Sequence, residues 1–175
     1  MILKCYSESI KKDKLLLILD RDSTIIVDQG YMWDPKMLEF LPGALESIKF
    51  ASENNFNIAI ATNQSGIDRG FFSLEDFLNF TQALVRIVNM NGGRIDCVAA
   101  CPHSPERKCD CRKPKPGLIE ALLRQFECPK ENAIFLGNAQ SDVEAGNSAE
   151  VHSDIAVGSA IKDKLRLWMS LSDHN

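Results

Sequence analysis

The sequence has no excess of positive charge and no long apolar run. Its 175 residues include 20 Lys or Arg and 24 Asp or Glu, for a formal net charge of −4. This balance disfavours wide nucleic-acid binding, which needs a basic face. No run approaches the ~20 apolar residues that span a bilayer, and the N-terminal stretch lacks the apolar region of a signal peptide. We therefore expect a cytoplasmic protein without a membrane or nucleic-acid partner.

Strand-like and helix-like segments alternate along the chain, which predicts an α/β fold with a mainly parallel sheet flanked by helices. The length suits one domain, residues 1–175, with the informative motifs between about 15 and 150. The expected strands are 15–19, 56–61, 95–100, 133–136 and 154–157. The expected helices are 45–51, 73–89, 116–126, 142–149 and 162–171.

Polar clusters follow four of these strands: Asp20-Arg21-Asp22, Thr62-Asn63-Gln64-Ser65, the loop from Cys101, and Gly137-Asn138. In open α/β sheets, ligands bind beyond the carboxyl ends of the strands. We therefore expect the clusters to converge on one edge of the sheet, where they would form a single site.

Asp20 and Asp22 lie two residues apart after a buried strand, so an extended backbone points both carboxylates to one side. Their repulsion is relieved by a cation, and magnesium prefers such oxygens. One aspartate can then attack phosphorus, while the other transfers protons to and from the reacting oxygens. The alternative for an isolated Asp-x-Asp is a solvated loop whose carboxylates cap nearby amides.

Six cysteines are present, and three of them stand close to a histidine. Cys101, His103, Cys109 and Cys111 make a complete tetrahedral zinc set with no position left for water, which predicts a structural zinc site. The alternative is buried free thiols or a redox pair. Because the apolar content is sufficient for a core, we expect the fold to need no disulfide.

Other polar residues suit an anionic ligand, although each alone could be a turn, a cap or solvated surface. Thr62 and Asn63 can hydrogen-bond phosphate oxygens, and Arg69 suits an anion. Lys113 can neutralise charge that develops on a phosphoryl group, and Arg112 can bind a second anionic group. Either Asn138 or Asp142 could supply a further metal oxygen; a helix cap is the competing role of Asp142.

Together these segments resemble the haloacid dehalogenase superfamily of phosphatases, and within it the D-glycero-D-manno-heptose 1,7-bisphosphate 7-phosphatases. The resemblance covers about residues 15–150, and its most specific parts are the cysteine loop and the stretch 62–70. The residues that carry it are Asp20–Ile25, Asp28–Tyr31, Thr62–Ile67 with Arg69-Gly70, the cysteine loop through Cys111-Arg112-Lys113-Pro114 and Pro116-Gly117, and the Gly137 segment.

The resemblance implies a Rossmann-like fold without a separate cap domain, in which the zinc loop shapes the substrate pocket. It implies that Asp20 is the nucleophile and a magnesium ligand, and that Asp22 is the acid/base and binds magnesium through its main-chain oxygen. Thr62 and Lys113 would hold the transferring phosphoryl group. The implied substrate-binding residues are Asp28, Gln29, Gly30, Tyr31, Asn63, Gln64, Ser65, Arg69 and Arg112.

The chain departs from this family at three positions. The family usually has Gly at the position of Ser23, which matters only if the backbone there needs a positive φ. It usually has a magnesium-binding Asp at the position of Asn138 and often a substrate-binding Lys at that of Ala139. We expect weakened magnesium affinity, with Asp142 as a compensating ligand.

The function implied is magnesium-dependent removal of the 7-phosphate of a heptose bisphosphate through an aspartyl-phosphate intermediate, in carbohydrate metabolism. The nearest alternative is a histidinol-phosphate phosphatase or another small sugar-phosphate phosphatase. An alternative of another class is a catalytically weak binding or regulatory protein, because of Asn138 and Ala139. We expect a monomer whose partner is a small phosphorylated sugar.

Overall fold

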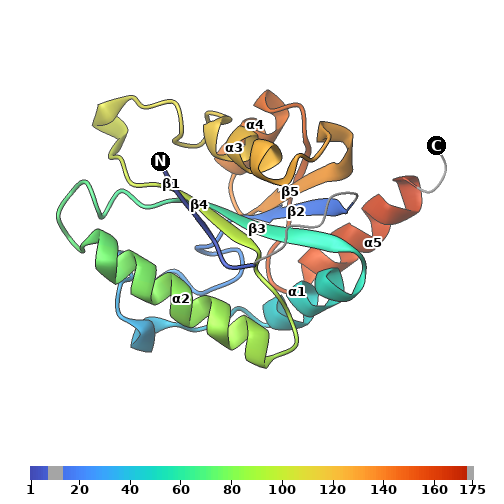
Figure 1. The fold of residues 1–175 in the computed structure, drawn as a ribbon, viewed down its shortest axis with the longest axis horizontal. Coiled ribbons are helices and arrows are strands. Elements are labelled where there is room, and N and C mark those ends of the chain that lie inside the picture. The colour runs from blue at the N-terminus through green and yellow to red at the C-terminus, as the bar shows by residue number, and fades with distance from the viewer. Residues whose placement is uncertain (8–13, 173–175) are drawn as a thin grey trace.

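The computed structural model describes residues 1–7 and 14–172, which form one six-stranded sheet between two layers of helices (Figure 1). The strands are β1 (Ile2–Cys5), β2 (Leu15–Leu19), β3 (Phe56–Asn63), β4 (Cys97–Cys101), β5 (Ala133–Gly137) and β6 (His152–Ile155). The helices are α1 (Ala44–Glu53), α2 (Leu74–Met90), α3 (Gly117–Phe126), α4 (Gln140–Ser148) and α5 (Ala160–Ser172), with 3-10 turns η1 (Pro35–Met37), η2 (Pro105–Arg107) and η3 (Lys130–Asn132).

The sheet has the order β1-β4-β3-β2-β5-β6, and every neighbouring pair is parallel except β1 with β4. Successive side chains of a strand face opposite sides of a sheet. In β2, Leu17 and Leu19 therefore enter one apolar core, while Leu16 and Ile18 enter the other. Burial on both faces explains why β2 is a continuous apolar run.

The helices lie in two groups (Figure 1). Helices α1, α2 and α5 cover one face and contribute Ile48, Phe80 and Leu165 to its core. Helices α3 and α4 cover the other face, where Leu122 and Ala145 are fully buried. The expected fold class is thus confirmed: a Rossmann-like, mainly parallel sheet flanked by helices.

Most expected elements are present, with small differences at their ends. The capping box between Ser73 and Asp76 starts α2 as its sequence indicates. β3 continues to Asn63, two residues beyond the expected end, and β6 ends at Ile155 instead of continuing to 157. The single-domain assignment over 1–175 remains a prediction, and residues 8–13 and 173–175 lie outside the described part.

Two features at the β1 edge differ from the expectation. No strand was expected before residue 15, yet β1 pairs antiparallel with β4. The pairing sets Cys5 opposite Cys97, and the two residues form a disulfide. The expectation that the fold needs no disulfide missed this pair, because the two cysteines are 92 residues apart in sequence and only the pairing of β1 brings them together.

The parallel strands bring their polar ends to one edge of the sheet. β2 lies between β3 and β5, so Asp20, Thr62 and Asn138 are at adjacent strand ends. Strands β3 and β4 lie on one side of β2, and β5 and β6 lie on the other, so the strand order reverses beside β2. Open α/β sheets bind ligands at such a point, beyond the carboxyl ends of the strands. Among the described helices, none is long and apolar enough to cross a membrane.

Candidate active site

Asp20 and Lys113 form a buried ion pair at the end of β2. Lys113 Nζ lies 2.6 Å from Asp20 Oδ1, 2.7 Å from Asp142 Oδ1 and 2.9 Å from the Ala61 carbonyl oxygen. Burial raises the pKa of Asp20 to about 6, since its effect and that of the neighbouring carboxylates exceed the opposing effect of Lys113. Burial alone would lower the pKa of Lys113, but Asp20 and Asp142 outweigh it and raise that pKa. The lysine is therefore a fixed cation beside the carboxylate of Asp20.

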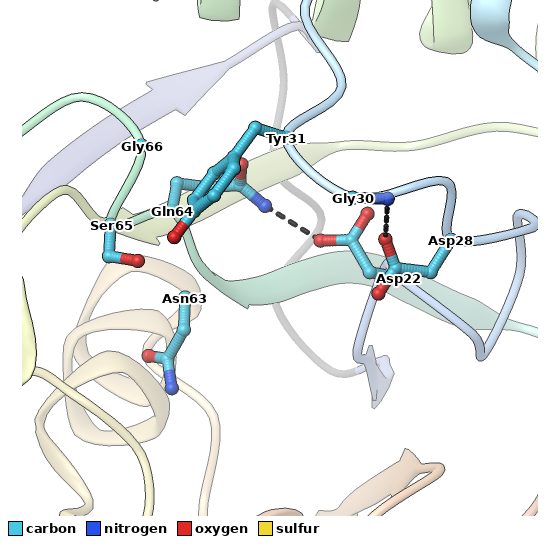
Figure 2. Close-up of a pocket in the computed structure, with 8 residues that line it drawn as sticks. All are labelled: Asp22, Asp28, Gly30, Tyr31, Asn63, Gln64, Ser65 and Gly66. Atoms are coloured by element: carbon cyan, nitrogen blue, oxygen red, sulfur yellow. Dashed lines mark hydrogen bonds between the residues drawn. The ribbon is translucent and has the colours of Figure 1, made fainter. Parts of the chain in front are cut away.

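Three side chains hold the carboxylate of Asp22. Arg21 donates from Nε to Oδ1 (2.9 Å) and from Nη2 to Oδ2 (3.1 Å). Gln64 Nε2 donates to Asp22 Oδ2 at 2.8 Å, as Figure 2 shows, and to Thr62 Oγ1 at 2.9 Å. The Thr62 hydroxyl lies 3.4 Å from Asp22 Oδ2. The structure thus unites Asp20, Asp22, Thr62 and Lys113, the four residues expected to carry the chemistry.

Arg21 is a residue that the sequence reasoning did not single out. It is buried, lies over the ring of Phe80 at 4.9 Å, and its Nη1 has no hydrogen-bond partner among the described residues. A charged residue between two aspartates in sequence was the only signal. Its fork-shaped guanidinium fits the carboxylate of Asp22 in two hydrogen bonds, which fixes the orientation of that carboxylate.

Asp142 has both carboxylate oxygens engaged by the protein. Oδ1 pairs with Lys113, and Oδ2 accepts hydrogen bonds from the main-chain N–H groups of Asn138 (3.1 Å) and Ala139 (3.0 Å). This geometry favours a helix cap and lysine partner over a compensating magnesium ligand. The amide of Asn138 instead faces Asp20 Oδ2 at 3.2 Å and the Asp22 main-chain oxygen at 3.3 Å. These three groups fit the oxygen-rich environment that magnesium prefers.

A pocket of about 240 Å³ opens beside Asp22 (Figure 2). Its lining residues come from the loop after β2, the last residue of β3 and the loop that follows β3: Asp22, Asp28, Gly30, Tyr31, Asn63, Gln64, Ser65 and Gly66. Gly30 has a φ of +95° and donates its N–H to Asp28 Oδ1 at 2.8 Å, which shapes the first loop. A Cβ at Gly66 would lie 2.2 Å from the Phe72 ring, so any larger residue at this position of the second loop would require that ring to move.

The expected substrate residues divide into two groups. Asp28, Gly30, Tyr31, Asn63, Gln64 and Ser65 line this pocket; Gln29, Arg69 and Arg112 do not. Arg69 pairs with Glu106 at 3.5 Å, and Arg112 donates to the His103 carbonyl oxygen at 3.3 Å. Their roles in substrate binding remain predictions.

Asn63 joins the end of β3 to the main chain of Lys113. Its Oδ1 accepts from the Lys113 N–H and its Nδ2 donates to the Lys113 carbonyl oxygen, both at 3.2 Å. Both polar atoms of the amide are thus used inside the protein. This pairing indicates that Asn63 positions Lys113, in addition to lining the pocket.

Cys101, His103, Cys109 and Cys111 form one cluster, with their ligand atoms within 4.8 Å of one another. The sulfur of Cys109 lies 3.6 Å from those of Cys101 and Cys111, and His103 Nδ1 lies 3.7 Å from the Cys101 sulfur and 3.4 Å from the Cys111 sulfur. Zinc bonded tetrahedrally at ~2.3 Å to sulfur and ~2.0–2.1 Å to nitrogen needs ligand separations of roughly 3.5–3.8 Å. The cluster is therefore compatible with zinc.

The cysteine loop is attached to the loop that lines the pocket. Asp68 accepts a hydrogen bond from the Ser104 N–H at 3.0 Å and pairs with Arg107 at 3.1 Å. The Gln64 N–H donates to the Cys101 carbonyl oxygen at 2.7 Å. The cysteine cluster thus supports the pocket wall from outside, a role of Asp68 that the sequence did not reveal.

Ser23 has a φ of +58°, so the backbone does require a positive φ at this departure from the family pattern. The turn is held by hydrogen bonds from the Ser23 N–H to the Ile26 carbonyl oxygen (2.9 Å) and from the Ile25 N–H to the Arg21 carbonyl oxygen (3.1 Å). A side chain is strained in this region, so the serine is accommodated at a cost in stability.

Comparisons with known proteins identify relatives of this chain. A family model described as "Polynucleotide kinase 3 phosphatase" matches residues 16–166. The D-glycero-beta-D-manno-heptose-1,7-bisphosphate 7-phosphatase of Helicobacter pylori is 37% identical over 140 residues, which cover 79% of this chain and 81% of that protein. The chain belongs to the haloacid dehalogenase superfamily, in the heptose 1,7-bisphosphate 7-phosphatase family.

Two further members of this family are informative. The D-glycero-alpha-D-manno-heptose-1,7-bisphosphate 7-phosphatase of Campylobacter jejuni is 34% identical over 147 residues, with 84% of each chain covered. The crystal structure of the D,D-heptose 1,7-bisphosphate phosphatase of B. bronchiseptica, complexed with magnesium and phosphate, aligns with a TM-score of 0.77 and 25% identity. That alignment covers 87% of this chain and 98% of the other.

Proposed function

We propose that this protein is a magnesium-dependent phosphatase that removes the 7-phosphate of D-glycero-D-manno-heptose 1,7-bisphosphate. The single observation that carries the proposal is the buried contact of Lys113 with Asp20, beside Asp22 and Thr62, in a chain of this family. Relatives named for the alpha and the beta anomer are similarly distant from this chain, so both anomers are candidate substrates.

The side chains divide the reaction between them. A carboxylate oxygen of Asp20 attacks phosphorus, which forms an aspartyl phosphate as the bond to the sugar oxygen breaks. Asp22 in its protonated form gives its proton to the departing sugar oxygen, and the carboxylate so formed then removes a proton from the water that hydrolyses the intermediate. Lys113 and Thr62 bind the phosphoryl oxygens, whose negative charge they stabilise.

Two metal ions complete the proposal. Magnesium would be held by Asp20, the main-chain oxygen of Asp22 and Asn138, and it would supply positive charge to the phosphoryl oxygens. Zinc would be held by Cys101, His103, Cys109 and Cys111. Since Arg112 and Lys113 directly follow this set, a rigid loop would help to direct them to the site.

The two alternatives are less well supported. A histidinol-phosphate phosphatase and a binding protein share the aspartate motif, but the relatives reported above are named for heptose bisphosphates. The proposed monomer and the cytoplasmic location follow from the sequence expectations alone.

Phosphate release from a substrate panel tests the proposal, with zinc-replete protein and added magnesium. The panel contains both heptose 1,7-bisphosphate anomers, histidinol phosphate and simple hexose phosphates. We expect turnover of a heptose bisphosphate with loss at the 7-position, and none with Asp20→Asn. Preference for histidinol phosphate, or no turnover of any compound, would refute the assignment.

The proposed intermediate can be detected directly. Asp22→Asn removes both the acid and the base, but with an aryl phosphate, whose leaving group needs no protonation, it leaves Asp20 able to react. Intact-mass measurement after mixing with the aryl phosphate should then show one added phosphoryl group, which Asp20→Asn should lack. Phosphorylation of the Asp20→Asn variant would place the nucleophile elsewhere.

A further inference from the structure

The side-chain amide of Asn138 faces two oxygens that have no hydrogen to give. One is Asp20 Oδ2 at 3.2 Å, and the other is the main-chain oxygen of Asp22 at 3.3 Å; the Thr24 hydroxyl, which can donate or accept, lies 3.4 Å from the same end of the amide. Only the nitrogen of an amide donates hydrogen bonds, so the neighbours favour the orientation with Nδ2 toward them. In that orientation one NH₂ group hydrogen-bonds both oxygens.

The positions of the Asn138 amide, Asp20 Oδ2 and the Asp22 main-chain oxygen also match neighbouring corners of an octahedron. Magnesium binds oxygen at ~2.0–2.1 Å, which places neighbouring ligands about 2.8–3.0 Å apart. The two separations around Asn138 exceed this value by only a few tenths of an ångström. A cation there requires oxygen from all three groups, so the amide must present Oδ1.

We propose that the Asn138 amide substitutes for the cation in the metal-free protein and reverses when magnesium binds. Without metal, Nδ2 donates to Asp20 and to the Asp22 main chain; with metal, Oδ1 becomes a ligand. The amide NH₂ therefore competes with magnesium for the same oxygens. This inference rests on the magnesium site of the proposed function and adds a second state of that site.

The charges around Asn138 explain what the amide does in the metal-free state. Asp20 and Asp142 share one cation, Lys113, so the cluster has more negative than positive charge. Asp22 has Arg21 as its own partner. An NH₂ group carries positive partial charge and supports Asp20, whereas a carboxylate at position 138 would repel it. The amide of Asn138 thus stabilises the metal-free protein but lowers its affinity for magnesium.

Three matched proteins separate this proposal from simple weakening of a ligand. They are the wild type, Asn138→Asp and Asn138→Ala, all zinc-replete, measured with and without magnesium by thermal unfolding and calorimetry. Asn138→Asp should lower the metal-free Tm but bind magnesium at least about tenfold more tightly. Asn138→Ala should lower the metal-free Tm as well and bind magnesium more weakly than the wild type.

The amide itself is the most direct reporter. The side-chain ¹⁵N–¹H pair of Asn138 is assigned by its absence from the Asn138→Asp spectrum. Magnesium should shift this pair strongly, while that of Asn91, which donates to the Ile87 carbonyl oxygen at the end of α2, should stay in place. Neither measurement uses a substrate, so failure of the substrate panel does not affect them.

Two results would overturn the inference. One is an Asn138→Ala variant whose metal-free Tm equals that of the wild type. The other is an Asn138 amide pair that does not move while calorimetry shows the magnesium site to be saturated.

Discussion

Replacing Lys113 by Met should be among the most destabilising single substitutions in this protein. The Nζ atom lies 2.6 Å from Asp20 Oδ1 and 2.7 Å from Asp142 Oδ1, and all three side chains are buried. At an effective dielectric constant of about 20, each attraction is about 6 kcal/mol, and much of it compensates for removing the charges from water. Loss of the cation leaves two buried carboxylates uncompensated, which costs about 3–5 kcal/mol of unfolding free energy.

Lys115 provides a matched control in the same loop. Its Nζ lies 2.9 Å from Asp110, a distance close to those of Lys113, but its side chain is 47% exposed. Exposed pairs of this kind contribute little, so Lys115→Met should leave the urea midpoint unchanged. The two variants share the substitution and a short ion-pair distance but differ in burial and in the number of paired carboxylates, so the comparison shows what the buried ion-pair network contributes.

Urea unfolding near pH 7 measures both variants, with phosphate release as the second readout. Adding Asp142→Leu to Lys113→Met should recover part of the lost stability, because one unpaired carboxylate is removed, but should recover no turnover. A Lys113→Met protein within about 1 kcal/mol of the wild type would refute the reasoning. So would equal losses in Lys113→Met and Lys115→Met, since distance alone would then set the energy.

Three further predictions concern other parts of the fold. Cys109→Ser should lose the bound zinc and have a lower Tm. Cys128→Ser, outside the cluster, should keep one zinc per chain by elemental analysis. Equal zinc contents in the two variants would exclude the zinc site at the cysteine cluster. In urea titrations, Ser23→Gly should stabilise the protein by up to about 1 kcal/mol, because glycine adopts the positive φ of this turn without strain. Ser23→Val should destabilise it by more than about 1 kcal/mol. The opposite order of stabilities would disprove this account of the turn. Hydrogen bonds from Ser73 lower the pKa of Asp76, so this carboxylate stabilises the fold above its unfolded pKa and stabilises it less as the pH falls. The difference in urea midpoint between the wild type and Asp76→Ala should therefore narrow toward about pH 3. A difference that stays constant with pH would contradict this pH dependence.

Local patterns in the sequence predicted the elements and most of the chemistry. The apolar run before Asp20, the capping box at Ser73 and the spacing of the cysteine loop each depend on residues that are close in sequence. Such patterns report periodicity, hydrogen-bonding capacity and ligand type, which are properties of a short segment. They were therefore sufficient for the α/β class and for the grouping of polar residues at one edge of the sheet.

These local patterns could not identify contact partners that are distant in sequence. Asp142 can bind a metal or a lysine equally well by its chemistry, and only the packing of α4 against the end of β5 places it on Lys113. Asp68 looked like an ordinary charged residue until the folded chain brought it to Arg107, 39 residues later. Arg21 pairs with its sequence neighbour Asp22, but its place over the ring of Phe80 depends on the packing of α2. The disulfide of Cys5 likewise depends on the register of an unexpected strand.

The sequence by itself determined which chemical groups this protein brings to the sheet edge, because strand ends and ligand spacing are encoded within short segments. The tertiary structure decided which group each one contacts. Asn138 shows the difference: the sequence reveals an amide at a position where the family usually has a carboxylate, but only the fold places it 3.2 Å from Asp20. Hydrogen bonds and ion pairs act over a few ångströms, so their partners are settled only when distant segments pack together.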